Sequence, residues 1–300
     1  MKRIRVQVPA TITNVGPGLN TIGIAVKYYN YITIEDASEP GVAIANLNEA
    51  EKLSAVEVNH FKKIVCDFWS KIPFEPPTGI KIINDFRIPL NRGLNSMAAG
   101  VMGLLLAASQ YAELELKPDE ILNVFEHYQI GHHNFCASIF GGFVIAVKAD
   151  RGIVVHKIPF DSELNITLII PDYEVSGSKM QQLLPKNVSM EDAVFNVGRT
   201  ALFVASVCSG NFKALNVSME DKLHQPYRRR LLPAADAISL ISKTCDSMGV
   251  SLCGDGASLL ILHKNNCEAT IKKIKNAYLR HKIPVELIHS EIDEMGISLI

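Results

Sequence analysis

The feature that most constrains the fold of this chain is an apolar run, Ala98 to Ala108, which Gly100 and Gly103 interrupt. The run falls well short of the roughly 20 residues that a helix needs to span a bilayer. It follows a polar loop, Pro89 to Ser96, and such a loop directs unpaired backbone N–H groups and the positive end of a helix dipole at one point. The sequence therefore predicts a long apolar helix whose start binds a phosphate. An ordinary capped and buried helix explains the same spacing, and the spacing alone does not separate the two.

Length and composition narrow the class of protein. The chain has 300 residues, of which 48% are hydrophobic and 20% charged, which predicts two globular domains and excludes a disordered or collagen-like chain. Lys+Arg at 30 and Asp+Glu at 31 give a net charge of -1, so we expect neither nucleic acid nor a membrane as a partner. Six cysteines without a CxxC pair, and no signal-peptide apolar block, predict reduced thiols and a cytoplasmic protein.

The hydrophobic pattern predicts a different order of elements in the two halves of the chain. In the first half, strands are expected at 4–9, 29–35 and 79–83, and a hairpin at 142–147 and 152–158. A helix is expected at 54–72, with Ser54 and Glu57 as a capping box at its start. In the second half, strands are expected at 164–170, 250–253, 258–263 and 285–289, with helices at 179–184, 190–208, 234–246 and 268–281. The second order is typical of a split βαβ sandwich, so we place a domain boundary near residue 160.

Four segments match motifs of one known family. Val8 to Asn20 is similar to V-P-A-T-x-A-N-x-G-P-G-F-D, and Pro89 to Ala99 is similar to P-x-x-x-G-L-G-S-S-A-A. Asp221 to Arg228 reads D-x-L-H-Q-P-Y-R, and Gly254 to Ser258 is similar to the end of S-G-x-G-P-S. Together these segments resemble the GHMP small-molecule kinases, and the homoserine kinases among them in particular.

The resemblance implies a fold, a reaction and a set of cofactors. The implied fold is the α+β GHMP kinase fold, with a ribosomal-S5-like N-terminal domain at 1–160 and a ferredoxin-like C-terminal domain at 161–300. The phosphate loop belongs to the first domain, and the site lies in the cleft between the two. The implied reaction is ATP-dependent phosphorylation of the L-homoserine hydroxyl in threonine biosynthesis, with ATP and Mg²⁺ as cofactors, a small amino acid as substrate and a homodimer as a possible assembly.

The same resemblance assigns candidate site residues, motif by motif. The catalytic candidates are His133 and Glu126, and Glu126 is also a candidate metal ligand together with Ser96. The placement of a gap also allows Gln129 or Asn123 at the position of Glu126. The substrate-binding candidates are Asn14, Asn20, Asn134, Arg199 and Arg228. The nucleotide-binding candidates are Arg92, Gly93, Leu94, Asn95 and Ser96. Arg228 is the natural partner for a substrate carboxylate, because a guanidinium group binds a carboxylate with two parallel hydrogen bonds.

Departures from the family pattern fall on positions that serve nucleotide, metal and substrate. Asn95 replaces the middle glycine of the phosphate loop, Met97 replaces its second serine, His133 stands where the family has an aspartate, and Asn20 replaces the last aspartate of the first motif. Magnesium prefers oxygen ligands, so a thioether at 97 removes one of them. A second function therefore stays open: a homologue without ATP-dependent kinase activity that binds an amino acid or small metabolite as a sensor or partner, or runs other chemistry in the same cleft.

Two expectations concern residues beside these motifs. His224 is expected to be a hydrogen-bonding histidine of the structure rather than a catalyst. Arg229 and Arg230 are expected to form a solvated basic run.

Overall fold

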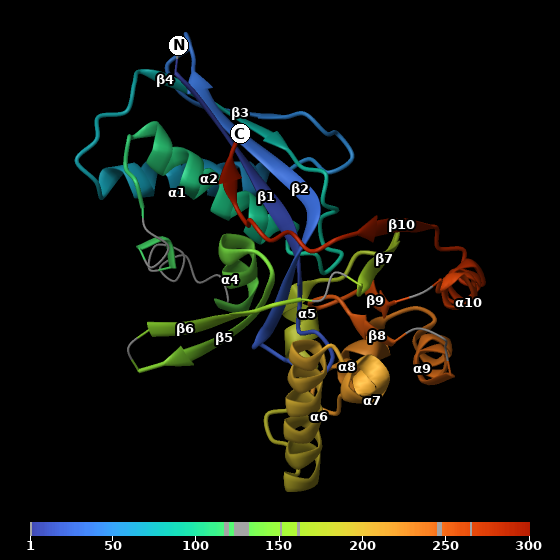
Figure 1. Cartoon of the computed structure of the whole chain (residues 1–300). Helices are drawn as coiled ribbons and strands as arrows, with labels where there is room; N and C mark the ends of the chain where they lie inside the picture. Colours follow the sequence, from blue (N-terminus) through green and yellow to red (C-terminus); the bar gives the residue numbers. More distant parts are fainter. Residues whose placement is uncertain are drawn as a thin grey trace.

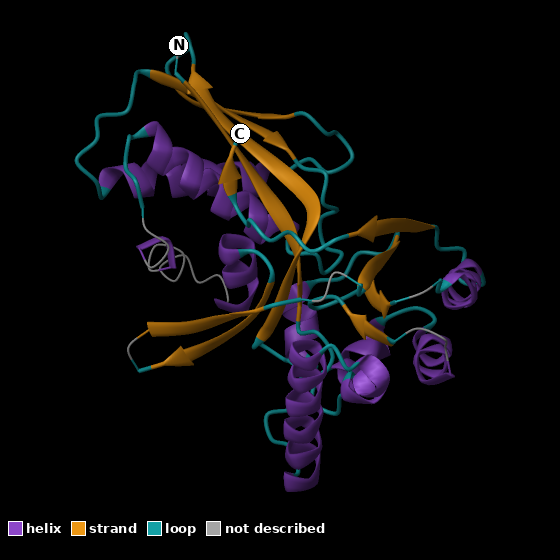
Figure 2. Ribbon diagram, viewed as in Figure 1, coloured by secondary structure: helices purple, strands orange, loops and turns teal. Residues whose placement is uncertain are grey.

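The computed structural model describes residues 2–116, 120–122, 132–150, 152–160, 163–244, 248–264 and 266–300. Two β-sheets with separate helical layers make up these residues (Figure 1, Figure 2). The arrangement is the α+β class that the sequence predicts.

The first sheet is built around two long antiparallel strands, β1 (Arg3–Thr13) and β2 (Ile22–Asp36). Its strand order is β11-β1-β2-β4-β3, with β3 at Gly41–Asn46 and β4 at Gly79–Asp85. The hairpin of β5 (Phe143–Ala149) and β6 (Gly152–Ile158) joins this sheet through the start of β2. The register of β1 against β2 shifts between Pro9 and Ala10, because a proline has no N–H to donate to the ladder.

The helices α1 (Ala55–Ser70), α2 (Ser96–Tyr111) and α4 (His132–Phe140) accompany the first sheet. The predicted capping box of α1 is confirmed, since Ser54 N donates to Glu57 Oε2 at 2.7 Å and Glu57 N donates to Ser54 Oγ at 3.4 Å. The predicted apolar helix is α2, and it is buried along most of its length. A side chain at Gly103 would come within 2.7 Å of Ile32, so this glycine lets α2 pack closely on the sheet.

The second sheet has the order β10-β7-β9-β8, and all its neighbours are antiparallel. Its strands are β7 (Asn165–Pro171), β8 (Gly249–Leu252), β9 (Leu259–His263) and β10 (Val285–Ser290). In chain order this is 4-1-3-2, the order of a split βαβ sandwich, so the predicted ferredoxin-like topology is confirmed. Its main helices are α9 (Ala235–Thr244) and α10 (Glu268–Leu279).

Between β7 and β8 the chain forms α5 (Gly177–Gln182), the long α6 (Met190–Ser209), and the short α7 (Leu215–Ser218) and α8 (Gln225–Arg228). Helix α6 extends away from both sheets (Figure 1). Helices α7 and α8 each have a 3₁₀ turn beside them, at Phe212–Ala214 and Arg229–Leu231.

The C-terminus returns to the first sheet. The last strand, β11 (Ser298–Leu299), pairs with β1, and the two lie side by side in Figure 1. Just before it, Asp293 accepts a hydrogen bond from Tyr29 Oη at 2.6 Å and its backbone N–H donates to Ala25 O at 3.0 Å. The predicted second domain therefore contributes its final residues to the sheet of the first, and the division near residue 160 stays a prediction.

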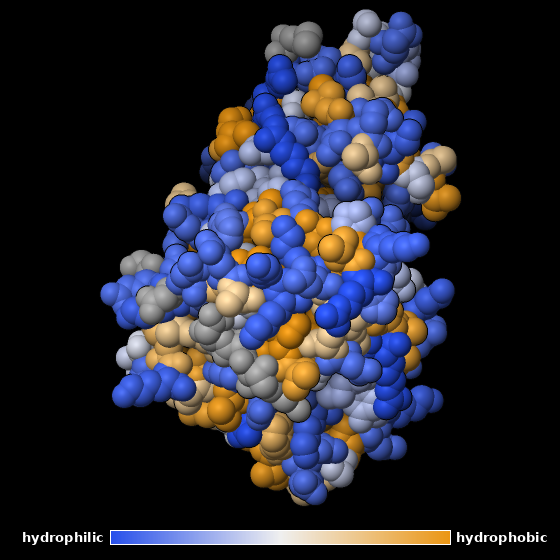
Figure 3. Space-filling model, turned by 90° about the vertical axis from the view of Figure 1, so that its right-hand side faces the viewer, coloured by the Kyte–Doolittle hydropathy of each residue, from blue (hydrophilic) through white to orange (hydrophobic). Residues whose placement is uncertain are grey.

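Polar and apolar side chains alternate over the described surface of the protein. On the face shown in Figure 3, small groups of apolar side chains lie among polar ones. Within the described ranges, no helix is both long enough and apolar enough to cross a membrane.

Candidate active site

A cavity of about 370 Å³ opens at the start of α2. From the first half of the chain, its wall includes His60 of α1 and the loop residues Asn91, Gly93 and Asn95 to Met97. Gly177 and the pair Asp255 and Gly256 close it from the second half. The N-terminus of a 16-residue helix faces this cavity, so unpaired N–H groups and the helix dipole favour an anion there.

The side chain of Asn95 does not block this cavity. Asn95 has φ 59°, a left-handed conformation that asparagine tolerates better than most residues. Its Nδ2 donates to Thr11 O at 3.1 Å, to Thr11 Oγ1 at 2.9 Å and to Thr13 Oγ1 at 3.3 Å. The amide is thus held against β1, and a cavity remains beside the loop even though asparagine replaces glycine.

The loop packs directly on the turn from Cys253 to Ser258. Ser258 N donates to Arg92 O at 3.0 Å, and Gly254 N donates to Thr13 O at 2.8 Å. A Cβ on Gly93, which has φ +81°, would lie 2.5 Å from the Gly256 carbonyl oxygen and closer still to that of Cys253. Only glycine fits at 93, because both the backbone conformation and the neighbouring carbonyls exclude a side chain.

The side chains of the other nucleotide-binding candidates are held by the protein itself. Arg92 forms ion pairs with Asp172 at 2.9 Å and Glu174 at 3.5 Å, and Leu94 is fully buried in the core. Ser96 Oγ donates to Ile88 O at 2.6 Å and accepts from Asn30 Nδ2 at 3.0 Å. What this loop offers a ligand is therefore mainly backbone. These assignments stay predictions. Ser96 Oγ donates its one proton to Ile88 and accepts from Asn30, so it would bind a metal through its second lone pair.

Thr11 joins the loop to α4. Its hydroxyl accepts from Asn95 and donates to Asn134 O at 3.5 Å, so the first motif, the phosphate loop and α4 meet at this residue. His133 belongs to α4, but its side chain lies outside the described residues, and Glu126 lies outside them altogether. Both catalytic candidates stay predictions, as does the substrate role of Asn134.

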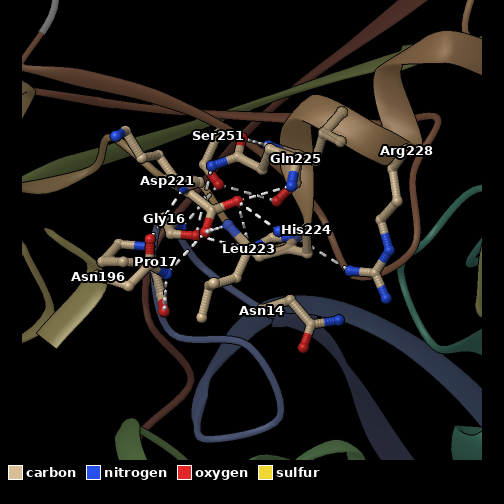
Figure 4. A network of polar contacts seen from close by, with 12 residues as sticks. Asn14, Gly16, Pro17, Asn196, Asp221, Leu223, His224, Gln225, Arg228 and Ser251 are labelled. Carbon is tan, nitrogen blue, oxygen red and sulfur yellow. Dashed lines mark hydrogen bonds and ion pairs between the residues drawn. The ribbon is translucent and has the colours of Figure 1, made fainter. Parts of the chain in front are cut away.

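The D-x-L-H-Q-P-Y-R motif begins with an aspartate that organises the chain around it. Asp221 Oδ1 accepts from the backbone N–H of Leu223 at 2.9 Å and from Asn196 Nδ2 at 2.8 Å. Asp221 Oδ2 accepts from the backbone N–H of His224 at 2.9 Å and of Gln225 at 2.6 Å. The carboxylate thereby fixes the entry to α8 and ties it to α6 (Figure 4).

The middle of the same motif binds the turn at Gly16, which belongs to the Val8 to Asn20 segment. His224 Nε2 lies 2.7 Å from Gly16 O, and Gln225 Nε2 donates to the same oxygen at 3.3 Å. Gly16 N donates in turn to Ser251 Oγ of β8 at 2.8 Å. His224 is completely buried in these contacts, so its expected structural role is consistent with the geometry (Figure 4).

The motif ends at Arg228, which is completely buried. Its Nη1 donates to His224 Nδ1 at 3.1 Å and to Gly254 O at 3.3 Å, and its Nη2 lies 2.6 Å from Asp255 Oδ1. Since His224 Nε2 donates to Gly16, its Nδ1 is the acceptor for Arg228. Burial lowers the pKa of Arg228 while the Asp255 carboxylate opposes that shift, so a buried cation sits behind the cavity.

The remaining substrate candidates divide into two groups. Asn14 is buried with φ 58°, and its Oδ1 accepts from the backbone N–H of exposed Asn20 at 2.8 Å, so these two lie together. Figure 4 shows Asn14 beside the residues of the Asp221 network. Arg199 of α6 forms an ion pair with Glu220 at 2.9 Å, and its guanidinium lies 4.3 Å from the Phe195 ring centroid. The substrate roles of all three stay predictions.

The expected solvated run is wrong for Arg229. This side chain is partly buried, with Nη1 donating to Ser239 Oγ at 3.0 Å and Nη2 to Gln225 Oε1 at 3.4 Å. The short helix followed by a 3₁₀ turn directs it inward, which a run of three arginines does not reveal. Arg230 is exposed, as expected.

Sequence reasoning assigned no role to Asp255, although it lines the cavity and pairs with Arg228. An acidic residue between two glycines of a motif was the only available signal.

The buried histidine makes stability depend on pH. Burial lowers the pKa of His224 to about 4, with Asp221 opposing and Arg228 reinforcing the shift. An unfolded histidine titrates near 6.5, so between about 6.5 and 4 the unfolded chain binds a proton that the folded chain excludes. We expect the free energy of unfolding to fall by roughly 1 to 3 kcal/mol as the pH falls through this window.

Denaturant unfolding at several pH values measures this dependence. His224→Gln should unfold more easily at pH 7 but lose less stability on acidification than the parent protein. His281→Gln removes an exposed histidine and should leave the pH slope unchanged. Parallel slopes for the parent and His224→Gln would contradict the assignment.

The fold and this site define a class of protein. The long apolar helix behind a glycine-bearing anion loop, beside a ferredoxin-like sheet, is the arrangement of a GHMP-type kinase, and the model of the GHMP kinases N terminal domain matches residues 59–142. A homoserine kinase from Persephonella marina is 31% identical over 302 residues, covering 100% of this chain and 99% of that protein. One from Aquifex aeolicus is 32% identical over 88% of each chain. The chain belongs to the homoserine kinase family of GHMP kinases.

Solved structures agree with this assignment. A homoserine kinase from Cytophaga hutchinsonii superposes with a TM-score of 0.86 at 25% identity, covering 100% of this chain and 98% of that one. The mevalonate kinase of L. major, solved with R-mevalonate, has a TM-score of 0.75 at 13% identity and shows the shared fold alone.

Proposed function

We propose that this protein transfers the γ-phosphoryl group of ATP to the hydroxyl of L-homoserine. The observation that carries the proposal is the cavity of about 370 Å³ at the start of α2, which persists although asparagine replaces the loop glycine. The hydrogen bonds of Asn95 to Thr11 and Thr13 account for this, because they hold the amide on β1. The alternative, a homologue without ATP-dependent kinase activity, would be favoured by a blocked loop, and it also rests on the replacements at Asn20, Met97 and His133.

The phosphate side of the site is supported by backbone chemistry. The loop from Gly93 to Ser96 leads into α2, so its N–H groups and the helix dipole would bind the phosphates of a nucleotide. GHMP kinases use ATP with Mg²⁺, and the metal neutralises charge on the phosphoryl group. Ser96 Oγ keeps a lone pair while it donates to Ile88, and Met97 offers only sulfur, so Ser96 and Glu126 are the proposed protein ligands.

The substrate side is supported by charge and by the turn at Asn14. Arg228 would bind the amino-acid carboxylate, and the Asp221 network holds the guanidinium in place through His224. Asn14 and Asn20 would contact the rest of the substrate, and His133 would accept the hydroxyl proton, which an imidazole can do near neutral pH. Assembly as a homodimer also remains a prediction.

A product assay tests the proposal. The protein is incubated with Mg-ATP and L-homoserine, and phosphohomoserine is detected by mass spectrometry and ³¹P NMR. We expect a product that requires both ATP and Mg²⁺, and none with L-2-aminobutyrate, which lacks the hydroxyl. Calorimetry that detects homoserine binding but no Mg-ATP binding, with no product, would favour a binding protein on the same scaffold.

A further inference from the structure

The turn between β8 and β9 holds Asp255 on a fixed backbone. Gly254 N donates to Thr13 O at 2.8 Å, and Ser258 N donates to Arg92 O at 3.0 Å, while Cys253 N donates to Ser258 O at 2.9 Å within the turn. The Asp255 side chain, by contrast, is 38% exposed and lines the cavity of about 370 Å³. A rotation of this side chain therefore has free space to enter, while the backbone stays in place.

Asp255 lines the cavity and contacts a cation that is buried behind it. The Arg228 side chain is 0% exposed, and its Nη2 lies 2.6 Å from Asp255 Oδ1. Its Nη1 faces inward, to His224 and Gly254. Among the described residues, Arg228 Nε has no hydrogen-bond acceptor, so this guanidinium keeps an unused donor while buried. A buried guanidinium that has an unused donor and pairs with a partly exposed carboxylate is suited to exchange that carboxylate for another.

We propose that Asp255 is a specificity-determining residue whose carboxylate occupies the place on Arg228 that a substrate carboxylate takes, so that the substrate binds by displacing it. The inference rests on the proposed function only in naming Arg228 as the carboxylate-binding residue. Displacement exchanges one carboxylate–guanidinium pair for another, so the net gain for the substrate is smaller than at an uncovered arginine. Burial raises the pKa of Asp255, which is consistent with a carboxylate that gains solvation when it swings into the cavity.

Two fragments of homoserine distinguish an Asp255 that competes for Arg228 from an Asp255 that contacts the substrate amine. The probe 4-hydroxybutyrate carries the hydroxyl and carboxylate without the amine, and 3-amino-1-propanol carries the hydroxyl and amine without the carboxylate. Their affinities and that of L-homoserine are measured by calorimetry for the parent protein, Asp255→Asn and Asp255→Ala. Asp150→Asn is the matched control, because it removes one negative charge at an exposed hairpin tip. Cooperative thermal unfolding verifies that each variant is folded, and two different substitutions guard against failure of one.

We expect both Asp255 variants to bind 4-hydroxybutyrate about tenfold more tightly than the parent, with 3-amino-1-propanol changed less than about twofold. Unchanged affinity for 4-hydroxybutyrate would overturn the inference. Weaker binding of L-homoserine and of 3-amino-1-propanol would also overturn it, because Asp255 would then be a contact for the substrate amine. Phosphohomoserine formation by the parent protein is scored separately. If the parent protein forms phosphohomoserine but the Asp255 variants bind 4-hydroxybutyrate no more tightly, only the inference about Asp255 is overturned. If the variants bind 4-hydroxybutyrate more tightly but the parent protein forms no product, only the proposed function is overturned.

Discussion

Replacing Arg228 with glutamine should lower kcat/KM for L-homoserine by about a hundredfold or more, with most of the change in KM. Glutamine removes the charge that binds the substrate carboxylate and leaves Asp255 without its partner, 2.6 Å away in the parent protein. The uncompensated Asp255 carboxylate then repels an incoming carboxylate, so the loss exceeds that of one hydrogen bond. Initial rates at saturating Mg-ATP over a range of homoserine concentrations measure the effect.

Arg230→Gln is the matched control for this substitution. It makes the same chemical change two residues further on, at an exposed side chain that lies over the Tyr227 ring at 5.3 Å. Its kinetics should stay close to those of the parent protein. Because Arg228 also donates to His224 and Gly254, rates are measured below the melting temperature of the variant. Equal losses for Arg228→Gln and Arg230→Gln would show that Arg228 has no special role in substrate binding.

Much of the fold can be predicted from periodicity. The capping box at Ser54, the apolar helix after residue 95 and the hairpin around residue 150 are local signals, and each is confirmed. The strand order of the second sheet follows from the order of its strands and helices along the chain. Crossover connections between parallel strands are almost always right-handed, so few sheet topologies are compatible with that order.

The strands that escaped prediction lack such signals. Strand β3 is partly exposed along most of its length, without a clean alternation, and among the described residues it pairs with β4 alone. Strand β11 has two residues, and its pairing with β1 joins opposite ends of the chain. Neither short-range pattern nor composition encodes a contact of that separation.

The candidate site can be located by its motifs, but side-chain directions cannot be read from them. Asn95 departs from the family pattern and looks like an obstruction in the sequence. It is accommodated because Thr11 and Thr13, two residues apart on β1, present their hydroxyls to the same neighbour. The same limit applies to Ser96, whose hydroxyl is directed to Ile88, and to Asp255, whose pairing with Arg228 depends on a turn of precise shape.

Replacing Gly93 with alanine should reduce kcat/KM for ATP by more than about a hundredfold and lower the free energy of unfolding by about 2 to 4 kcal/mol. The new Cβ would lie 2.5 Å from the Gly256 oxygen, closer still to the Cys253 oxygen, and on a backbone with φ +81°. Backbone atoms cannot rotate away as a side chain does, so the loop and the turn must separate. The hydrogen bond from Ser258 N to Arg92 O lengthens, and the N–H groups of the loop lose their common direction.

Gly41→Ala separates conformational strain from this steric conflict. Gly41 also has a positive φ, +95°, but an added Cβ there meets nothing within 4 Å. It should therefore cost about 1 to 2 kcal/mol from strain alone and leave the kinetics for ATP unchanged. Denaturant titration and nucleotide kinetics of both variants give the comparison. The contrary outcome is that Gly93→Ala loses stability while its kinetics for ATP stay those of the parent protein. Close packing of the loop on the Cys253–Ser258 turn would then contribute to folding and not to nucleotide binding. The phosphate site would in that case have to lie elsewhere.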